Sequence, residues 1–270
     1  MKINPLFTEK ILTKFIREEL KKFHFEKAVL GLSGGLDSSV AAFLCARALG
    51  AQNVLALIMP YGKSFQEDFS DAKKVVKILK INSKIIDIKP MVDTYYSKYP
   101  IKNRLIKGNK MARERMSILY DFSSREKAMV IGTSNKTELL LGYGTLYGDM
   151  ASGINPIGDL YKTQIKQIAK HLGVPQEIIK KSPSAGFWAG QTDEKEIGIK
   201  YEELDKILFQ IVDLRKQKDE VISMGFSEKT ISRIAEMIKK SEFKRNLPPI
   251  PKISERTVGH DLLFPYDWGK

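Results

Sequence analysis

The chain has 270 residues, and its 45 Lys and Arg side chains outnumber its 32 Asp and Glu side chains, giving a formal charge of +13. This length accommodates one large domain or two small ones, and a composition of 43% hydrophobic and 29% charged residues excludes the disordered and fibrous classes. The single cysteine, Cys45, excludes an intramolecular disulfide framework and a CxxC pair for zinc or redox chemistry.

The first predicted element is an amphipathic helix ending near Lys22, because apolar residues recur every three to four positions. Its charged positions distinguish it from a signal peptide, and no apolar run reaches the roughly 18 residues of a membrane span. We therefore expect a cytoplasmic protein without a membrane partner. Lys27 to Gly31 is a short apolar run, typical of a strand buried on both faces of a parallel sheet.

Strands and helices are predicted to alternate through the first half of the chain. Further strands are expected at 53–59, 83–88 and 128–132, and helices at 37–49, 65–81, 108–126 and 163–172. This alternation predicts an α/β fold with a doubly wound, mainly parallel, Rossmann-like sheet. Residues after Tyr201 are expected to form extra, charged C-terminal helices, followed by a loosely ordered tail from about Leu247. No linker clearly divides the chain, so a single domain over residues 1–270 is expected.

The segment SGGLDSS, residues 33–39, follows the first predicted strand and opens a helix. Adjacent glycines let the backbone turn sharply and point its N–H groups at an anion, which the helix N-terminus also attracts. The segment fits neither GxxxxGK[ST] nor GxGxxG. Asp37 would repel a phosphate unless a cation intervened, so the pattern favours Mg²⁺ with a phosphorylated substrate. A plain turn with Asp37 as a helix cap is the alternative.

The SGGLDSS loop resembles the pyrophosphate loop of the ATP pyrophosphatase superfamily, which cleaves ATP between its α and β phosphates. Five later segments are GNKMARERMSILY from Gly108, GTSNKTE from Gly132, GYGTLYGD from Gly142, PIGDLYKT from Pro156 and PSAGFWAGQTDE from Pro183. In this order they closely resemble the ammonia-dependent NAD synthetases, over roughly residues 5–250. The resemblance implies that ATP adenylylates the nicotinate carboxylate of deamido-NAD and that ammonia then displaces AMP.

The resemblance also assigns roles to individual residues. It implies that ATP is bound by Gly31, Leu32, Ser33, Gly34, Gly35, Leu36, Asp37, Ser38, Thr133, Lys162 and Ser184. It makes Asp37 and Glu138 the Mg²⁺ ligands, and we expect the fourth strand beside the first, so that both carboxylates reach one crevice. Asp149 matches the carboxylate that positions ammonium and accepts its proton. The alternatives are a solvated helical Glu138 and a simple turn at Asp149.

Arg113 and Arg115 point about 200° apart on the predicted helix, so only one of them can face the site. The resemblance implies that Arg113 is the one that binds deamido-NAD. A surface ion pair is the alternative for Arg113. The remaining deamido-NAD positions of the resemblance are Leu146, Gly153, Phe243 and Lys244. Many relatives carry Lys at the position of Leu146, Asp at that of Gly153 and a His-Lys pair at that of Phe243-Lys244. The details of dinucleotide binding are therefore not expected to carry over from the resemblance. The segment 182–198, with Phe187 and Trp188, is predicted to be a lid, or else a packing loop.

The resemblance implies a homodimer without a glutaminase domain, using ATP, deamido-NAD and free ammonia. A tRNA-modifying enzyme of the same superfamily is one rival, suggested by the charge of +13. Against it stand the lack of a recognisable RNA-binding module and of additional thiols, so no nucleic-acid partner is expected. A nucleotide sensor without catalysis is a second rival, but it predicts a lost carboxylate, whereas Asp37, Glu138 and Asp149 are all present.

Overall fold

The computed structural model describes residues 1–62, 66–184, 186, 188 and 191–263. Its strands are β1 (Lys27–Gly31), β2 (Val54–Ile58), β3 (Asn82–Ile85) and β4 (Ala128–Val130). They form one parallel sheet in the order β3-β2-β1-β4. The chain thus reverses its direction of winding after β3, and β4 pairs with β1 on the side away from β2. The predicted doubly wound α/β fold is confirmed.

The helices connect and cover these strands. They are α1 (Pro5–Lys22), α2 (Leu36–Leu49), α3 (Gln66–Leu79), α4 (Lys89–Lys98), α5 (Arg104–Glu126), α6 (Lys136–Leu141), α7 (Lys162–Leu172), α8 (Gln176–Lys180), α9 (Asp193–Ile197), α10 (Tyr201–Leu208), α11 (Lys218–Ser223) and α12 (Glu228–Lys240). Short 3-10 turns lie at Ala51–Asn53 and Glu242–Lys244, and α10 continues as a π-helical turn at Phe209–Asp213.

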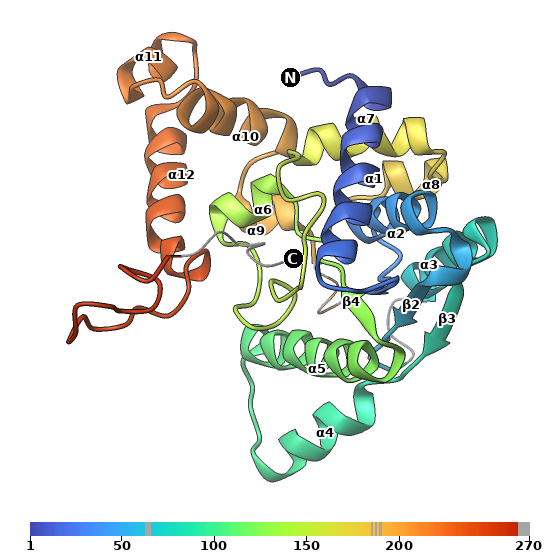
Figure 1. The fold of residues 1–270 in the computed structure, drawn as a ribbon. Coiled ribbons are helices and arrows are strands. Elements are labelled where there is room, and N and C mark those ends of the chain that lie inside the picture. The colour runs from blue at the N-terminus through green and yellow to red at the C-terminus, as the bar shows by residue number, and fades with distance from the viewer. Residues whose placement is uncertain (63–65, 185, 187, 189–190, 264–270) are drawn as a thin grey trace.

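Successive side chains of the strands point to opposite faces of the sheet and pack into two separate hydrophobic cores. Ala28 and Leu30 pack with α1, α2, α3, α7 and α8, whereas Val29, between them, packs with α4 and α5. Figure 1 shows α4 and α5 on one side of the sheet and α1, α2, α7 and α8 on the other. The sheet is therefore covered on both faces, which is why its central strands are continuous apolar runs.

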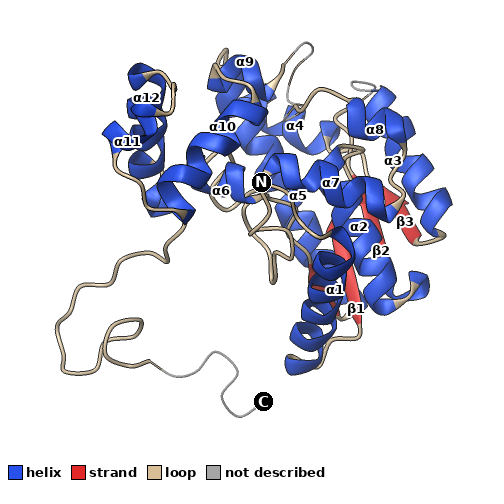
Figure 2. Cartoon of the chain, turned by 90° about the horizontal axis from the view of Figure 1, so that it is seen from above, coloured by secondary structure: helices blue, strands red, loops and turns tan. Residues whose placement is uncertain are grey.

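The C-terminal helices form a third cluster of their own. Side chains of α10, α11 and α12 pack together and against Leu141 of α6, so the helical extension is anchored next to the end of β4. Beyond Glu242–Lys244 the chain runs as a loop away from the helices (Figure 2). Within the described ranges, no helix is both long enough and apolar enough to cross a membrane.

The structure differs from the prediction in several elements. Helices α4 and α6 were not predicted, and α5 begins at Arg104 rather than at Gly108. The fourth strand ends at Val130, and Ile131 makes only an isolated bridge to Ile154. Strand β3 is exposed at every residue, so its register was not marked by buried apolar positions. Residue 65, the predicted start of the third helix, lies outside the described residues.

Candidate active site

The SGGLDSS loop connects the carboxyl end of β1 to α2, with Gly35 as the N-cap residue. Gly34 has φ +84°, and a Cβ there would lie 2.0 Å from the Asp68 carbonyl oxygen, so this position requires glycine. The Ser33 side chain accepts a hydrogen bond from the Gly35 N–H at 3.2 Å, and the Ser38 hydroxyl accepts one from the Ser33 N–H at 3.2 Å. These hydroxyl groups fix the loop against the first turn of α2, where the helix dipole favours an anion.

Asp37, Glu138 and Lys162 meet beside this loop. The Lys162 ammonium donates to Asp37 Oδ2 and lies 3.7 Å from Glu138 Oε1. Asp37 belongs to α2, Glu138 to α6 and Lys162 to the start of α7, so three segments that are far apart in sequence supply one cluster. Asp37 and Glu138, which we expected to approach one crevice, both lie next to the Lys162 ammonium.

Burial and mutual repulsion shape the charges of this cluster. Burial, and then the nearby Asp37 carboxylate, raise the pKa of Glu138 to about 8. Burial alone would lower the pKa of Lys162, but Asp37 and Glu138 outweigh it and raise the pKa above its usual range. Lys162 therefore stays an ammonium ion, although its side chain is only 4% exposed. The two carboxylates are thus placed to share one cation.

Two buried aspartates support Lys162 from the C-terminal helices. Asp205 of α10 accepts hydrogen bonds from the Thr137 hydroxyl at 2.7 Å and from the Thr163 N–H at 2.8 Å, which joins α6 and α7. Asp193 of α9 accepts hydrogen bonds from the Tyr143 and Tyr201 hydroxyls, both at 3.1 Å. The Lys162 ammonium lies 5.5 Å from the centre of the Tyr201 ring. The sequence analysis assigned no role to either aspartate: Asp205 belongs to no motif, and Asp193 lies near the end of the PSAGFWAGQTDE segment.

The residues predicted for deamido-NAD are only partly brought together. Arg113 Nε donates to the Leu146 carbonyl at 3.2 Å, whereas Arg115 Nε donates to the Met59 carbonyl at 3.0 Å, so the two arginines point in different directions as predicted. Lys244 Nζ donates to the Gly142 and Gly144 carbonyls, in the same turn-rich segment as Leu146.

Gly153 and Phe243 have quite different surroundings. A Cβ at Gly153 would lie 2.2 Å from Met129 Sδ, so a larger residue at this position would require the Met129 side chain to shift. The side chain of Phe243 is 61% exposed.

The other predicted site residues lie around the turn-rich segment and the lid. Asp149 Oδ1 accepts the Thr145 N–H at 2.7 Å, and desolvation by the surrounding protein raises the pKa of Asp149 although the residue keeps contact with solvent. Thr133 follows β4 and is half-buried. Ser184 is exposed and accepts the Gly186 N–H at 3.1 Å, without a contact to Asp37 or Lys162 among the described residues. The lid stays a prediction, because Phe187 lies outside the described residues.

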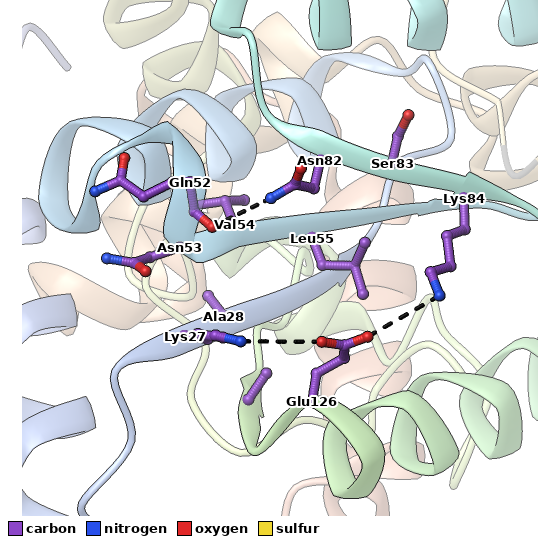
Figure 3. Close-up of a pocket in the computed structure, with 11 residues that line it drawn as sticks. Lys27, Ala28, Gln52, Asn53, Val54, Leu55, Asn82, Ser83, Lys84 and Glu126 are labelled. Atoms are coloured by element: carbon purple, nitrogen blue, oxygen red, sulfur yellow. Dashed lines mark hydrogen bonds and ion pairs between the residues drawn. The ribbon is translucent and has the colours of Figure 1, made fainter.

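A separate cavity of about 250 Å³ lies at the amino ends of the strands. Figure 3 shows Glu126 between Lys27 and Lys84, at 4.0 Å from each, and Asn82 donating to the Gln52 carbonyl. Ligands of doubly wound sheets bind beyond the carboxyl ends of the strands, which is the opposite edge. We therefore take the cluster around Lys162, and not this cavity, as the candidate active site.

The chain is similar to known proteins over nearly its whole length. The NAD synthase family model matches residues 8–248. The NH(3)-dependent NAD(+) synthetase of Trichlorobacter lovleyi is 48% identical over 270 residues, covering 100% of this chain and 99% of that protein. Two solved structures are 35% identical and cover 93% of this chain: NMN synthetase from Francisella tularensis (TM-score 0.83, 99% of its chain) and NH3-dependent NAD synthetase from Campylobacter jejuni (TM-score 0.80, 100% of its chain). This chain belongs to the NAD synthase family.

Proposed function

We propose that this chain is an ammonia-dependent NAD synthetase, a carbon–nitrogen ligase. In this reaction the nicotinate carboxylate of deamido-NAD attacks the α-phosphate of ATP, pyrophosphate leaves, and ammonia displaces AMP from the adenylate to give NAD. The observation that carries the proposal is the meeting of Asp37, Glu138 and Lys162 beside the SGGLDSS loop. This arrangement combines an anion cradle with a cation site, which cleavage of ATP between its α and β phosphates requires.

The donor set at this site fits Mg²⁺. Mg²⁺ prefers oxygen ligands and is usually held by one or two carboxylates together with substrate phosphates. Asp37 and Glu138 supply two carboxylates that already share a cation, the Lys162 ammonium. Among the described residues there is no group of three or more His, Cys, Asp or Glu side chains that would instead suit an all-protein metal site. Bound Mg²⁺ would neutralise phosphate charge, and Asp37 and Glu138 would hold it.

The chain's own groups then position the phosphates. The N–H groups of the SGGLDSS loop and the first turn of α2 bind the departing pyrophosphate, together with Ser33 and Ser38. The Lys162 ammonium turns from the carboxylates to the phosphates and stabilises their developing charge, because it stays protonated in its buried setting. Thr133 and Ser184 complete the ATP contacts.

Asp149 is the proposed base for the second half-reaction. Ammonia is mostly protonated at neutral pH, so a proton must be removed before the nitrogen can attack. Desolvation by the surrounding protein raises the pKa of Asp149, which makes it a stronger base than an unperturbed carboxylate. Its Oδ1 is held by the Thr145 N–H, and this hydrogen bond fixes the orientation of the group.

The dinucleotide is proposed to bind along Arg113, Leu146, Gly153, Phe243 and Lys244. The Arg113 guanidinium suits a phosphate or carboxylate. Gly153 packs closely on the Met129 side chain and offers no side chain of its own to the substrate. Because a structural relative is named an NMN synthetase, nicotinate mononucleotide is the substrate to compare with deamido-NAD.

A homodimer is proposed, with a second copy of this chain covering exposed apolar side chains of α4, of the loop that follows it and of the start of α5. Tyr99 is 64% exposed and Leu105 is 56% exposed, and Tyr95, Ile101 and Ile106 add to this surface. A contiguous apolar patch on a monomer marks an interaction site. Sedimentation equilibrium should give a molecular mass twice that of one chain. In the Leu105→Asp variant the measured mass should fall toward that of a single chain. We also propose that residues 1–270 act as one domain, in the cytoplasm.

The function is tested with purified protein, ATP, Mg²⁺, ammonium and deamido-NAD. We expect NAD, AMP and pyrophosphate in equal amounts, with less product from nicotinate mononucleotide. Asp37→Ala and Glu138→Ala should each abolish pyrophosphate release. No NAD at saturating substrate, or pyrophosphate release that depends on added tRNA, would overturn the proposal in favour of another reaction of this fold.

A further inference from the structure

Asn135 lies between the two carboxylates of the candidate metal site. It is fully buried, immediately before α6, and is the N-cap residue of that helix. Its Oδ1 accepts the Glu138 N–H at 3.0 Å, and its own N–H donates to Glu138 Oε2 at 3.3 Å. Its Nδ2 also donates to Asp37 Oδ1 at 2.9 Å, across 98 residues of sequence. One side chain therefore contacts both α2 and α6.

The contacts of Asn135 divide the carboxylate oxygens into two sets. Asn135 occupies Asp37 Oδ1 and Glu138 Oε2, whereas Asp37 Oδ2 and Glu138 Oε1 are the oxygens nearest the Lys162 ammonium. Each carboxylate thus uses one oxygen for Asn135 and turns the other toward the cation. An unrestrained carboxylate rotates about its terminal bond. The hydrogen bonds to Asn135 therefore determine that Asp37 Oδ2 and Glu138 Oε1 are the oxygens that face the cation.

The amide group of Asn135 has only one orientation that satisfies both partners. With the amide reversed, Oδ1 would face the Asp37 carboxylate and Nδ2 would face the Glu138 N–H, so both contacts would be repulsive. A side chain that only capped α6 would need a hydrogen-bond acceptor for the Glu138 N–H and no donor group. The donor toward Asp37 is therefore the feature that helix capping does not explain.

We propose that Asn135 is a positioning residue, which holds Asp37 and Glu138 in the orientation that chelates one divalent cation. This rests on the proposed function, because that function places Mg²⁺ at the same two carboxylates. Hydrogen-bond partners behind metal ligands typically change metal affinity by about 10–100-fold when removed. The amide of Asn135 acts on the metal through the Asp37 carboxylate, and its backbone N–H acts through the Glu138 carboxylate; the side chain does not touch substrate itself.

Two substitutions separate positioning from capping. Asn135→Ser keeps a good helix cap, because a serine hydroxyl accepts the N–H of the third helical residue, but it cannot reach Asp37. Asn135→Ala removes both functions. The matched control is Asn4→Ser at the N-cap of α1, where the same change affects a cap whose side chain accepts the Phe7 N–H, far from the site in sequence.

The measurement is titration of each protein with Mn²⁺ alone, with free Mn²⁺ followed by its electron paramagnetic resonance signal. We expect one Mn²⁺ per chain in the wild type and in Asn4→Ser, and about 10–100-fold weaker binding in both Asn135 variants. Of these variants, only Asn135→Ala should clearly lower the Tm of thermal unfolding. In turnover, Asn135→Ser should raise the KM for Mg²⁺ more than it lowers kcat at saturating Mg²⁺.

Each contrary result has a distinct meaning. If Asn135→Ser binds Mn²⁺ within twofold of the wild type while Asn135→Ala does not, Asn135 is a helix cap only and the inference is wrong. If the wild type forms NAD but both variants keep full Mn²⁺ affinity, the inference is likewise wrong and the proposed function stands. If the wild type forms no NAD at all, the proposed function itself has failed.

Discussion

Replacing Asp205 should destabilise the fold, because a single buried carboxylate ties three helices together. Asp205 is fully buried in α10 and accepts hydrogen bonds from the Thr137 hydroxyl of α6 and the Thr163 N–H of α7. Thr137 Oγ1 in turn accepts the Lys162 N–H at 3.1 Å. In Asp205→Ala the buried Thr137 hydroxyl and the partly buried Thr163 N–H both lose their acceptor.

The magnitude follows from those two donors. A buried donor left without a partner costs about 1–3 kcal/mol, so two of them give on the order of 2–6 kcal/mol. Burial raises the pKa of Asp205, because desolvation disfavours the charged carboxylate in the folded state. Removing the carboxylate also removes this unfavourable desolvation, which offsets part of the destabilisation. We expect a net decrease of about 2–4 kcal/mol in the free energy of unfolding, or roughly 5–15 °C in Tm.

Urea denaturation followed by circular dichroism measures this effect. The matched control is Asp159→Ala, since the Asp159 side chain is 96% exposed and its ion pair with Lys136 is worth little in water. Thr137→Val supplies a second arm, because the double variant with Asp205→Ala should lose clearly less than the sum of the single losses. A loss below about 0.5 kcal/mol for Asp205→Ala, or strict additivity with Thr137→Val, would refute the role of this network.

Three further positions give predictions of different kinds. Gly34→Ala should lower both Tm and ATP binding, since its Cβ would meet the Asp68 carbonyl oxygen at 2.0 Å in a backbone with φ +84°; unchanged ATP binding by calorimetry would contradict this. Gly153→Ala should cost about 1–3 kcal/mol in urea unfolding through its clash with Met129, and Met129→Ala in the same chain should remove most of that extra cost. Burial raises the pKa of Cys45 to about 12, so native protein at pH 8 should not react with a thiol reagent, whereas urea-unfolded protein should. Because the unfolded thiol ionises near pH 9, the stability difference between wild type and Cys45→Ala should be constant below pH 9 and shift against the wild type as pH rises toward 12.

The sequence predicted the central part of the sheet well for a physical reason. Strands β1 and β2 are covered on both faces, so they appear as continuous apolar runs, and the SGGLDSS loop between β1 and α2 has constraints that few other segments share. The edge strand β3 and helix α4 lack such a signal: β3 is exposed throughout, and Val92 is the only buried residue of α4. Elements at the border of a core leave little periodicity in the sequence.

The candidate site was predicted where a residue belongs to a motif and missed where it acts through a partner. Helix α6 could have been found, because Asn135 and Glu138 have the spacing of a capping box. The contact of Asn135 with Asp37 spans 98 residues, and Asp205 lies 68 residues from Thr137, so neither pairing leaves a local pattern. Long-range hydrogen bonds of this kind become visible only once the helices are placed in space.

The charge of the candidate site has the opposite sign to that of the whole chain. The chain carries a formal charge of +13. At the candidate site, however, one ammonium, that of Lys162, interacts with three acidic side chains, Asp37, Glu138 and Asp193, each of which raises its pKa. A phosphate entering this cluster would meet more negative than positive side chains. The basic excess therefore does not prepare the site for a polyanion by itself. A cation bound by Asp37 and Glu138, together with the N–H groups of the SGGLDSS loop, is what makes the cluster compatible with ATP.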